Sequence, residues 1–133
     1  MAISYDKKIM ECVLRSVMSE GNVAQGKAIK SICKSPKPLF ITGRAGTGKS
    51  FFIKRIVPAL KNAVIVAPTG IAAVNAGGQT IHSFFRIGMQ PYIPEIRNGK
   101  FMDNCENKFR GESEKILQNI KYLIIDEISM VRP

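Results

Sequence analysis

The sequence is poor in cysteine and has no long apolar run. Its three cysteines, Cys12, Cys33 and Cys105, are odd in number and too far apart for a zinc or redox pair, so we expect reduced thiols. No stretch approaches the roughly 18 apolar residues of a membrane span, and the first residues lack the apolar block of a secretory signal. We therefore expect an intracellular protein that is neither stabilised by disulfides nor embedded in a membrane.

Carboxylates are also scarce in the more basic part of the chain. The net charge is +10, residues 1–60 hold eleven basic and three acidic side chains, and no Asp or Glu occurs between residues 21 and 94. Such a segment attracts the phosphates of a nucleotide or a nucleic acid, although a merely solubilising cationic face has the same composition. The length of 133 residues and the 45% hydrophobic content suit one compact domain.

The hydrophobic pattern predicts helices that alternate with strands. Helices are expected over residues 6–19, from residue 22 to the prolines at 36 and 38, and over residues 49–57, 69–76 and 113–119. Short buried strands are expected over residues 39–42, 63–67 and 122–126, and residues 86–110 are expected to be irregular with at most one short helix. Continuous apolar strands in this alternation are typical of a parallel sheet covered by helices, so we predict an α/β fold.

A glycine-rich segment follows the first expected strand. Gly43-Arg44-Ala45-Gly46-Thr47-Gly48-Lys49-Ser50 matches the pattern G-x-x-x-x-G-K-[ST] of a phosphate-binding loop, and a helix is expected directly after it. Glycines let backbone N–H groups approach phosphates, and the helix N-terminus adds a positive dipole. We predict that Lys49 contacts the β and γ phosphates and that Ser50 ligates Mg²⁺. The nucleotide-binding candidates in this P-loop are Gly43, Ala45, Gly46, Thr47, Gly48, Lys49 and Ser50.

Two carboxylates follow the last expected strand. Asp126 and Glu127 come directly after an apolar run, and ligands of open α/β sheets lie at this carboxyl edge. We predict that Asp126 holds the Mg²⁺ that Ser50 contacts and that Glu127 polarises the attacking water, which makes both catalytic candidates together with Lys49. The competing interpretation is an acidic strand end at the surface.

These motifs narrow the class of NTPase. A GTPase would carry an N-K-x-D guanine-binding motif, whereas the nearest run, Asn107-Lys108-Phe109-Arg110, ends in arginine. A small-molecule kinase stays open, but a neighbouring Asp-Glu pair suits the activation of water better than transfer to a bound hydroxyl. Hydrolysis of a nucleoside triphosphate is therefore the favoured reaction.

Between the two motifs lies Ala67-Pro68-Thr69-Gly70-Ile71-Ala72-Ala73-Val74-Asn75-Ala76-Gly77-Gly78-Gln79-Thr80-Ile81-His82-Ser83-Phe84-Phe85. Together with the phosphate loop and residues 124–131, it closely resembles the PIF-type 5′-to-3′ DNA helicases of superfamily one. The likeness covers residues 22–133, which leaves residues 1–21 as an N-terminal helical extension. It implies the N-terminal part of a RecA-like motor domain that uses ATP and Mg²⁺. It also implies a monomeric motor that moves along single-stranded DNA and unwinds duplexes and forks in DNA repair, recombination or replication.

The resemblance further implies DNA contacts. Its two DNA-contacting motifs match residues 69–70 and 80–84, which gives the candidates Thr69, Gly70, Thr80, His82, Ser83 and Phe84. Hydroxyls, main-chain groups and flat rings suit single-stranded DNA. Structural interpretations stay open, because Thr69 could cap the next helix and His82 could be structural. Phe84 and Phe85 could equally pack in the core.

Gln25 lies 18 positions before Gly43, near the place where the family carries an adenine-reading glutamine. Its amide could pair with the adenine amino group and a ring nitrogen, which would favour ATP over GTP. Asn22-Val23-Ala24-Gln25 is also a plausible capping box, and the two roles are compatible.

The resemblance also implies parts that the 133 residues do not contain. Helicases of this kind have a second motor domain that supplies an arginine to the γ-phosphate, and neither Arg44 nor Arg132 is an obvious replacement. In the related ATPase folds a later strand inserts between the acidic strand and the phosphate-loop strand, so we expect two open strand edges here. We therefore expect an N-terminal fragment of a longer helicase, or a truncated product, that binds nucleotide weakly, hydrolyses it slowly and unwinds nothing. A loader-type or transposition-type ATPase and a non-catalytic nucleotide-binding module are the alternatives.

Overall fold

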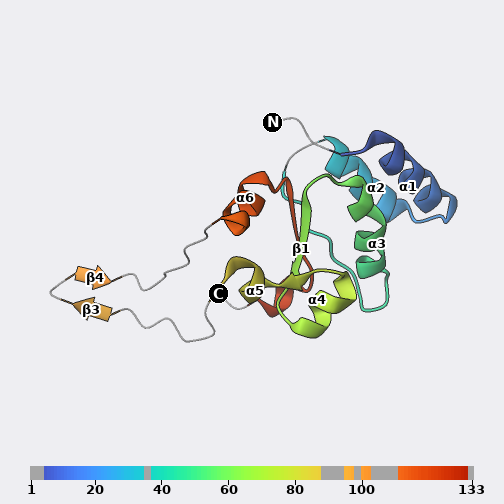
Figure 1. Cartoon of the computed structure of the whole chain (residues 1–133). Helices are drawn as coiled ribbons and strands as arrows, with labels where there is room; N and C mark the ends of the chain where they lie inside the picture. Colours follow the sequence, from blue (N-terminus) through green and yellow to red (C-terminus); the bar gives the residue numbers. More distant parts are fainter. Residues whose placement is uncertain (1–4, 35–36, 88–94, 98–99, 103–110, 132–133) are drawn as a thin grey trace.

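The computed structural model describes residues 5–34, 37–87, 95–97, 100–102 and 111–131. Figure 1 shows its helices and strands coloured along the sequence. Their bounds are α1 (Lys7–Ser19), α2 (Val23–Lys34), α3 (Lys49–Ile56), η1 (Val57–Ala59), β1 (Ala63–Ala67), α4 (Gly70–Ala76), β2 (Gln79–Thr80), α5 (Ile81–Phe85), β3 (Glu95–Arg97), β4 (Lys100–Met102), α6 (Glu112–Asn119), β5 (Tyr122–Ile125) and η2 (Ile128–Met130).

A three-stranded parallel sheet with the order β2-β1-β5 forms the centre of the structure. The middle strand is β1, an apolar run in which Ile65, Val66 and Ala67 are buried. β5 pairs along most of β1 on one edge, whereas the short β2 pairs with the end of β1 on the other edge. The prediction of an α/β fold with a parallel sheet is confirmed, and the carboxyl ends of its strands meet at one edge.

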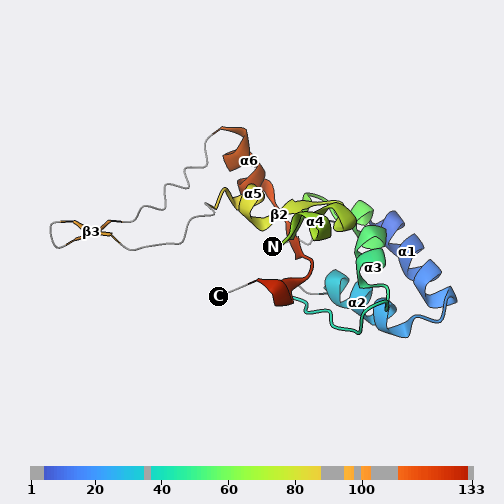
Figure 2. The ribbon, with the colours of Figure 1, turned by 90° about the horizontal axis from the view of Figure 1, so that it is seen from below.

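The helices build the core beside this sheet. In Figure 1, α1, α2 and α3 lie together on one side of β1 and α6 lies on the other, and Figure 2 again shows α6 apart from these three helices. The N–H of Asp6 donates to the carbonyl of Ala59, which ties the start of α1 to η1. The N-terminal helix thus shares one core with α2, α3 and η1, whose buried members are Met10, Val17, Ile29, Phe52, Ile56, Ala59 and Leu60.

The strand expected over residues 39–42 is not formed, so this part of the prediction is wrong. These residues are exposed and belong to no ladder of the described structure. A strand needs a partner at about 4.8 Å to satisfy its N–H and C=O groups. Since β5 pairs with β1 through one edge, the described residues place no partner beside residues 39–42. An apolar run is sheet-forming only where such a partner edge lies next to it.

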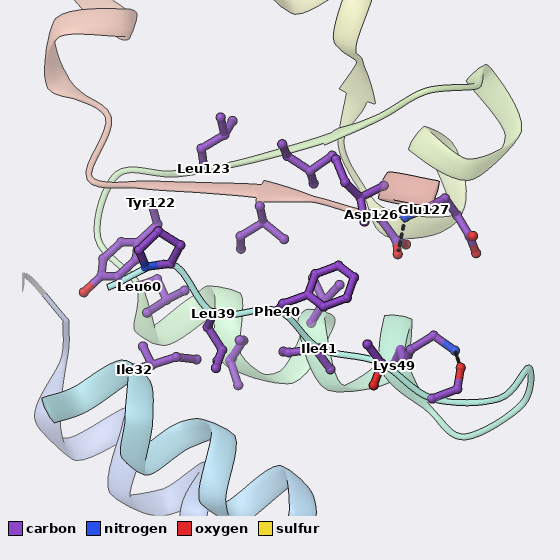
Figure 3. Close-up of a pocket in the computed structure, with 18 of the residues that line it drawn as sticks. Ile32, Leu39, Phe40, Ile41, Lys49, Leu60, Tyr122, Leu123, Asp126 and Glu127 are labelled. Atoms are coloured by element: carbon purple, nitrogen blue, oxygen red, sulfur yellow. Dashed lines mark hydrogen bonds between the residues drawn. The ribbon is translucent and has the colours of Figure 1, made fainter. Parts of the chain in front are cut away.

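A cavity of about 850 Å³ is lined by residues 38–43 and by β5. Figure 3 shows Leu39, Phe40 and Ile41 below the cavity and β5 above it. Phe40 is 73% exposed, and Leu123 of β5 is exposed as well. An unpaired apolar segment and an edge of β5 that has no partner among the described residues therefore face each other. Of the two open strand edges expected, the edge of the acidic strand is present, whereas the phosphate-loop strand is not formed.

The short elements that were not expected from the sequence are β2, α5, η2 and a hairpin formed by β3 and β4. The hairpin lies within residues 86–110, where at most one short helix was expected, and the remaining residues 88–94, 98–99 and 103–110 lie outside the described residues. Elements of two to five residues contain too few positions for a periodic hydrophobic signal, so the sequence pattern could not show them.

The state of the cysteines and the character of the helices can be compared with what the composition predicts. Cys12 is exposed and Cys33 is half-buried, both are free, and Cys105 lies outside the described residues. Within the part of the chain that the structure describes, no helix combines the length and the apolar character needed to cross a bilayer.

Candidate nucleotide-binding site

The predicted phosphate loop connects the unpaired apolar segment to α3. Gly48, directly before α3, has a left-handed backbone (φ +81°) that a side chain would strain. A Cβ on Gly43 would lie 2.7 Å from Thr47 Oγ1, so the loop closes too tightly for a larger residue there. The hydroxyl of Thr47 donates to the carbonyl of Arg44 at 2.8 Å, and its N–H donates to the same oxygen at 3.3 Å. The loop is therefore a tight, backbone-lined cradle; Gly46, at its bend, is also left-handed (φ +77°).

The Lys49 ammonium lies inside this cradle. Its Nζ donates to the carbonyl oxygens of Gly43 and Arg44, both at 2.9 Å. Lys49 is the first residue of α3, where the helix dipole favours an anion. A phosphate in the loop would offer the ammonium stronger, charge-assisted acceptors than these two carbonyls. Lys49 and Ala45 also line the cavity beside β5.

Asp126 directly follows β5 and is 8% exposed. Its N–H donates to the carbonyl of Val66 in β1 at 2.9 Å, which fixes the residue at the carboxyl edge of the sheet. Oδ2 accepts from the Ser50 hydroxyl at 3.2 Å, and Oδ1 accepts from the N–H of Glu127 at 3.0 Å. A buried carboxylate needs such partners. The phosphate loop and the acidic strand end, 76 residues apart, thus meet through Ser50 and Asp126.

The pair of oxygens fits a magnesium ion. Ser50 Oγ and Asp126 Oδ2 are hard donors from two different elements, and they already lie within hydrogen-bond distance of each other. Mg²⁺ usually takes one or two protein ligands and completes its octahedral shell with water and phosphate oxygens. The residues present therefore suit Mg²⁺ bound together with a triphosphate.

Glu127 lies beside Asp126 and lines the same cavity (Figure 3). Its side chain is exposed, and its backbone is left-handed with φ 53° and ψ 41°. A left-handed conformation costs a residue with a Cβ about 1–2 kcal/mol, and such strain clusters at functional sites. The turn places a second carboxylate at the strand end, where water can reach it.

Gln25 lies in the first turn of α2, against the end of the phosphate loop. Its Nε2 is 3.6 Å from the position that a Cβ on Gly48 would take. The N–H of Gln25 donates to Asn22 Oδ1 at 3.3 Å, which forms one half of the expected capping box. The reciprocal half is not formed, because the N–H of Asn22 donates to the carbonyl of Val17 at 3.1 Å instead. Gln25 Oε1 is buried and has no hydrogen-bond partner among the described residues. A buried acceptor without a partner costs about 1–3 kcal/mol, so this amide fits a polar ligand group such as a nucleobase amine.

The DNA-binding candidates lie at α4 and α5, which follow β1 and β2 at the same sheet edge as Asp126. Thr69 Oγ1 accepts from the N–H of Ala72 at 3.2 Å, and Thr80 Oγ1 accepts from the N–H of Ser83 at 3.1 Å. Both hydroxyls therefore cap a helix. The structural interpretation of Thr69 as a helix cap is confirmed. A DNA contact by either threonine would have to use the same hydroxyl group that caps its helix.

The aromatic candidates lie at the end of α5. Phe84 and Phe85 are half-buried, and their rings meet edge-to-face with centroids 4.9 Å apart. Gly70, His82 and Ser83 are exposed. The structure thus brings Lys49, Ser50, Asp126 and Glu127 together with the phosphate loop, and it places the DNA candidates as a separate group on the helices of the same sheet edge.

An ion pair between Glu20 and Arg55 was not predicted from the sequence. Arg55 of α3 donates from both terminal nitrogens to the carboxylate of Glu20, at 2.8 and 2.9 Å, where α1 ends. The two residues are 35 positions apart, so no local spacing points to the pair. One weak signal was available, since Glu20 is the last carboxylate before the long carboxylate-free stretch.

Comparison with known proteins shows what this chain is similar to. A family model described as PIF1-like helicase matches residues 17–133. The chain is 42% identical over 107 residues to the ATP-dependent DNA helicase PIF1 of Danio rerio and 44% identical over 101 residues to that of Xenopus laevis. These matches cover 78% and 73% of this chain but 16% and 14% of the two relatives.

A solved structure agrees with the sequence matches. The crystal structure of a Pif1 helicase from Bacteroides in complex with ADP-AlF3 and ssDNA is 43% identical to this chain and superposes with a TM-score of 0.68. The superposition covers 83% of this chain and 24% of the other. The chain thus spans between 14% and 24% of the length of these relatives.

Proposed function

Because this chain belongs to the PIF1-like helicase family, we propose that it forms the ATP-binding part of a DNA helicase that moves 5′ to 3′ along single-stranded DNA. The observation that carries the proposal is the 3.2 Å hydrogen bond between Ser50 Oγ and Asp126 Oδ2. A nucleotide-bound Mg²⁺ needs a P-loop hydroxyl and an acidic strand end at the same place. The relatives, named ATP-dependent DNA helicases, supply the class of reaction.

The proposed roles follow from the position of each side chain. The backbone of the phosphate loop holds the triphosphate, and Lys49 contacts its β and γ phosphates. Ser50 and Asp126 hold Mg²⁺, which when bound neutralises charge on the phosphates. Glu127 orients the attacking water and accepts its proton as the bond to the γ-phosphate breaks. Gln25 reads the adenine base with its side-chain amide.

We place single-stranded DNA against the DNA candidates of α4 and α5. Support comes from the Bacteroides relative, which was crystallised with ssDNA, and from the net charge of +10. The exposed candidates, His82 and Ser83, and the half-buried ring of Phe84 offer a hydroxyl, a ring nitrogen and a flat surface of the kinds that bind single strands. In the whole protein we propose a monomer that acts on DNA forks inside the cell, in repair, recombination or replication.

Calorimetry of the 133-residue chain with MgATP tests the site. Lys49→Ala is expected to weaken binding by about tenfold to a hundredfold, because it removes a charge-assisted bond to phosphate. Asp126→Asn is expected to remove the magnesium-dependent part of the affinity and to leave binding in EDTA unchanged. Lys54→Ala, an exposed lysine of the same helix, is the matched control.

Equal affinities for the unchanged chain and Lys49→Ala would overturn the proposal. In the whole protein the same substitution should abolish ATP hydrolysis while sparing most DNA binding, because the DNA candidates lie on other helices.

A further inference from the structure

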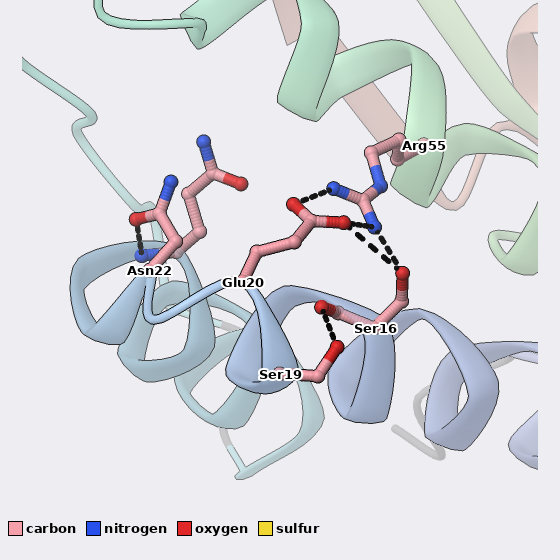
Figure 4. A network of polar contacts seen from close by, with 6 residues as sticks. Ser16, Ser19, Glu20, Asn22 and Arg55 are labelled. Carbon is pink, nitrogen blue, oxygen red and sulfur yellow. Dashed lines mark hydrogen bonds and ion pairs between the residues drawn. The ribbon is translucent and has the colours of Figure 1, made fainter.

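Arg55 of α3 binds two side chains at the end of α1. Its guanidinium donates to the Glu20 carboxylate at 2.8 and 2.9 Å and to the Ser16 hydroxyl at 2.6 Å. The Ser16 hydroxyl in turn donates to Glu20 at 3.2 Å. Figure 4 shows this closed set, which we call the Arg55 clamp and which consists of Ser16, Glu20 and Arg55. The guanidinium also lies 5.4 Å from the ring centroid of Phe51.

The clamp fixes orientation more than it adds stability. The side chain of Glu20 is 51% exposed, and that of Arg55 is 17% exposed. Ion pairs with an exposed partner contribute little to the free energy of folding. A planar bidentate contact, in contrast, defines the relative position of its two partners closely. The clamp therefore sets how the end of α1 lies against α3.

The turn between α1 and α2 (residues 20–22) links the clamp to Gln25, so the position of α1 also sets the position of Gln25. Glu20 ends α1, and Asn22 caps the first turn of α2 by accepting from the N–H of Gln25. Gly26 of α2 packs against α1 so closely that a Cβ there would lie 2.5 Å from Met18 Sδ. The first turn of α2 is therefore firmly attached to the end of α1.

Glu20 and Gln25, on either side of this turn, lie against the same face of α3. Gln25 lies against Gly48 at the start of α3, and Glu20 holds Arg55 near its end. Positions 48 and 55 are separated by about two helical turns, so they lie on the same side of the helix. The α1–α2 turn thus meets α3 through two contacts. One is the Arg55 clamp, and the other is the Gln25 amide, whose Oε1 has no hydrogen-bond partner among the described residues.

We infer that the Arg55 clamp is a positioning device for base recognition, which holds the Gln25 amide beside the phosphate loop so that adenine is preferred over guanine. The inference rests on the proposed function, because it presupposes a nucleotide in the loop. The amide offers a donor and an acceptor, which match the amino group and ring nitrogen of adenine, whereas guanine presents two acceptors at the corresponding edge. Glu20 and Arg55 act through Gln25 and do not touch the base.

Titration of the 133-residue chain with MgATP, MgGTP and inorganic tripolyphosphate tests the inference. Glu20→Gln keeps the size of the side chain and breaks the charge pair. It is expected to lower the preference for ATP over GTP about fivefold, the value of one hydrogen bond, and to leave the affinity for tripolyphosphate unchanged. Arg55→Gln should give the same loss. In a Gln25→Ala background neither change should have a further effect, because the amide through which the clamp acts is gone.

Glu11→Gln is the matched control, since Glu11 is an exposed carboxylate of the same helix and the change in charge is identical. If Glu20→Gln unfolds at the assay temperature, Ser16→Ala removes one bond of the clamp and gives the same readout. Equal losses of ATP and tripolyphosphate affinity, or an unchanged ATP-to-GTP ratio, would overturn the inference. It is also overturned if the unchanged chain binds ATP and GTP alike, although the phosphate loop then stands. Binding of none of the three probes would reject the proposed function itself.

Discussion

At the scale of single residues, two neighbouring carboxylates occupy different environments. Asp126 is buried and accepts hydrogen bonds from Ser50 and from the N–H of Glu127. Glu127 is exposed and sits on a left-handed backbone with φ 53°. A fixed, bonded carboxylate suits a metal ligand, whereas an accessible one suits proton exchange with water. The environments therefore favour different roles for adjacent residues of the same chemical type.

Glu127→Gln tests the role of the accessible carboxylate. In the whole protein supplied with DNA it is expected to lower the rate of ATP hydrolysis by about 10²–10⁴-fold, because glutamine cannot accept a proton. MgATP affinity and thermal stability should be unchanged, since glutamine has the same size and pays the same left-handed backbone cost. Single-turnover kinetics and calorimetry measure the two effects separately. Hydrolysis at the unchanged rate would exclude Glu127 as the base.

Candidate site residues could be predicted from the sequence where the chemistry requires certain residue types close together in the chain. The loop ending in Lys49 and Ser50 and the pair Asp126-Glu127 are local patterns, and the fold brings them together as expected. The Glu20–Arg55 pair joins positions 35 apart, so it depends on how three helices pack. The half-formed capping box of Gln25 likewise depends on the end of α1, because the N–H of Asn22 donates to the carbonyl of Val17 there.

At the scale of elements, two similar apolar runs have different outcomes. Residues 63–67 form β1 because they have a strand on each edge, and residues 39–42 remain outside the sheet because the described residues provide no neighbour. Hydrophobic pattern thus predicts the capacity for a strand, and long-range pairing decides whether it forms.

Hydrogen exchange of the 133-residue chain tests this difference. Amides of residues 39–42 should exchange with little protection, because they belong to no ladder of the described structure. Those of Ile65 and Val66, buried in the middle strand, should be among the slowest. Comparable protection of both segments would show that residues 39–42 are paired in solution.

The link between α1 and α3 predicts a pH dependence of stability. The hydrogen bond from Arg55 holds the pKa of Glu20 below its ordinary value of 4.5. Because the folded-state pKa is the lower one, the stabilisation is present above about 4.5 and is lost as the pH falls through the lowered pKa. Urea unfolding should therefore show a small loss of stability for Glu20→Gln relative to the unchanged chain at pH 7, because the exposed pair contributes little. The difference should shrink below about pH 4, near the pKa of a free carboxyl. A difference that is the same at both pH values would contradict the ionic origin.

At the scale of the whole molecule, most of the candidate site lies in the stretch of the chain that has basic side chains but no carboxylates. The stretch without carboxylates, residues 21–94, contains Gln25, the phosphate loop and the DNA candidates. The two candidate carboxylates, Asp126 and Glu127, lie outside this stretch, at the end of β5. In the proposed complex, the phosphates would therefore lie next to carboxylates mainly at the place where a magnesium ion would offset their charge.

Binding of single-stranded DNA by the 133-residue chain should accordingly depend on salt. A plot of log affinity against log salt concentration is expected to have a slope of about −2, which corresponds to roughly three phosphate contacts. His82→Ala and Ser83→Ala should weaken binding at every salt concentration without changing MgATP affinity, because they lie on α5, away from the phosphate loop.

With a forked duplex and ATP the same chain should show slow hydrolysis and no strand separation, since it spans between 14% and 24% of the length of the helicase relatives compared above. Robust unwinding by these 133 residues would mean that the motor needs neither the remaining length of its relatives nor an arginine from it.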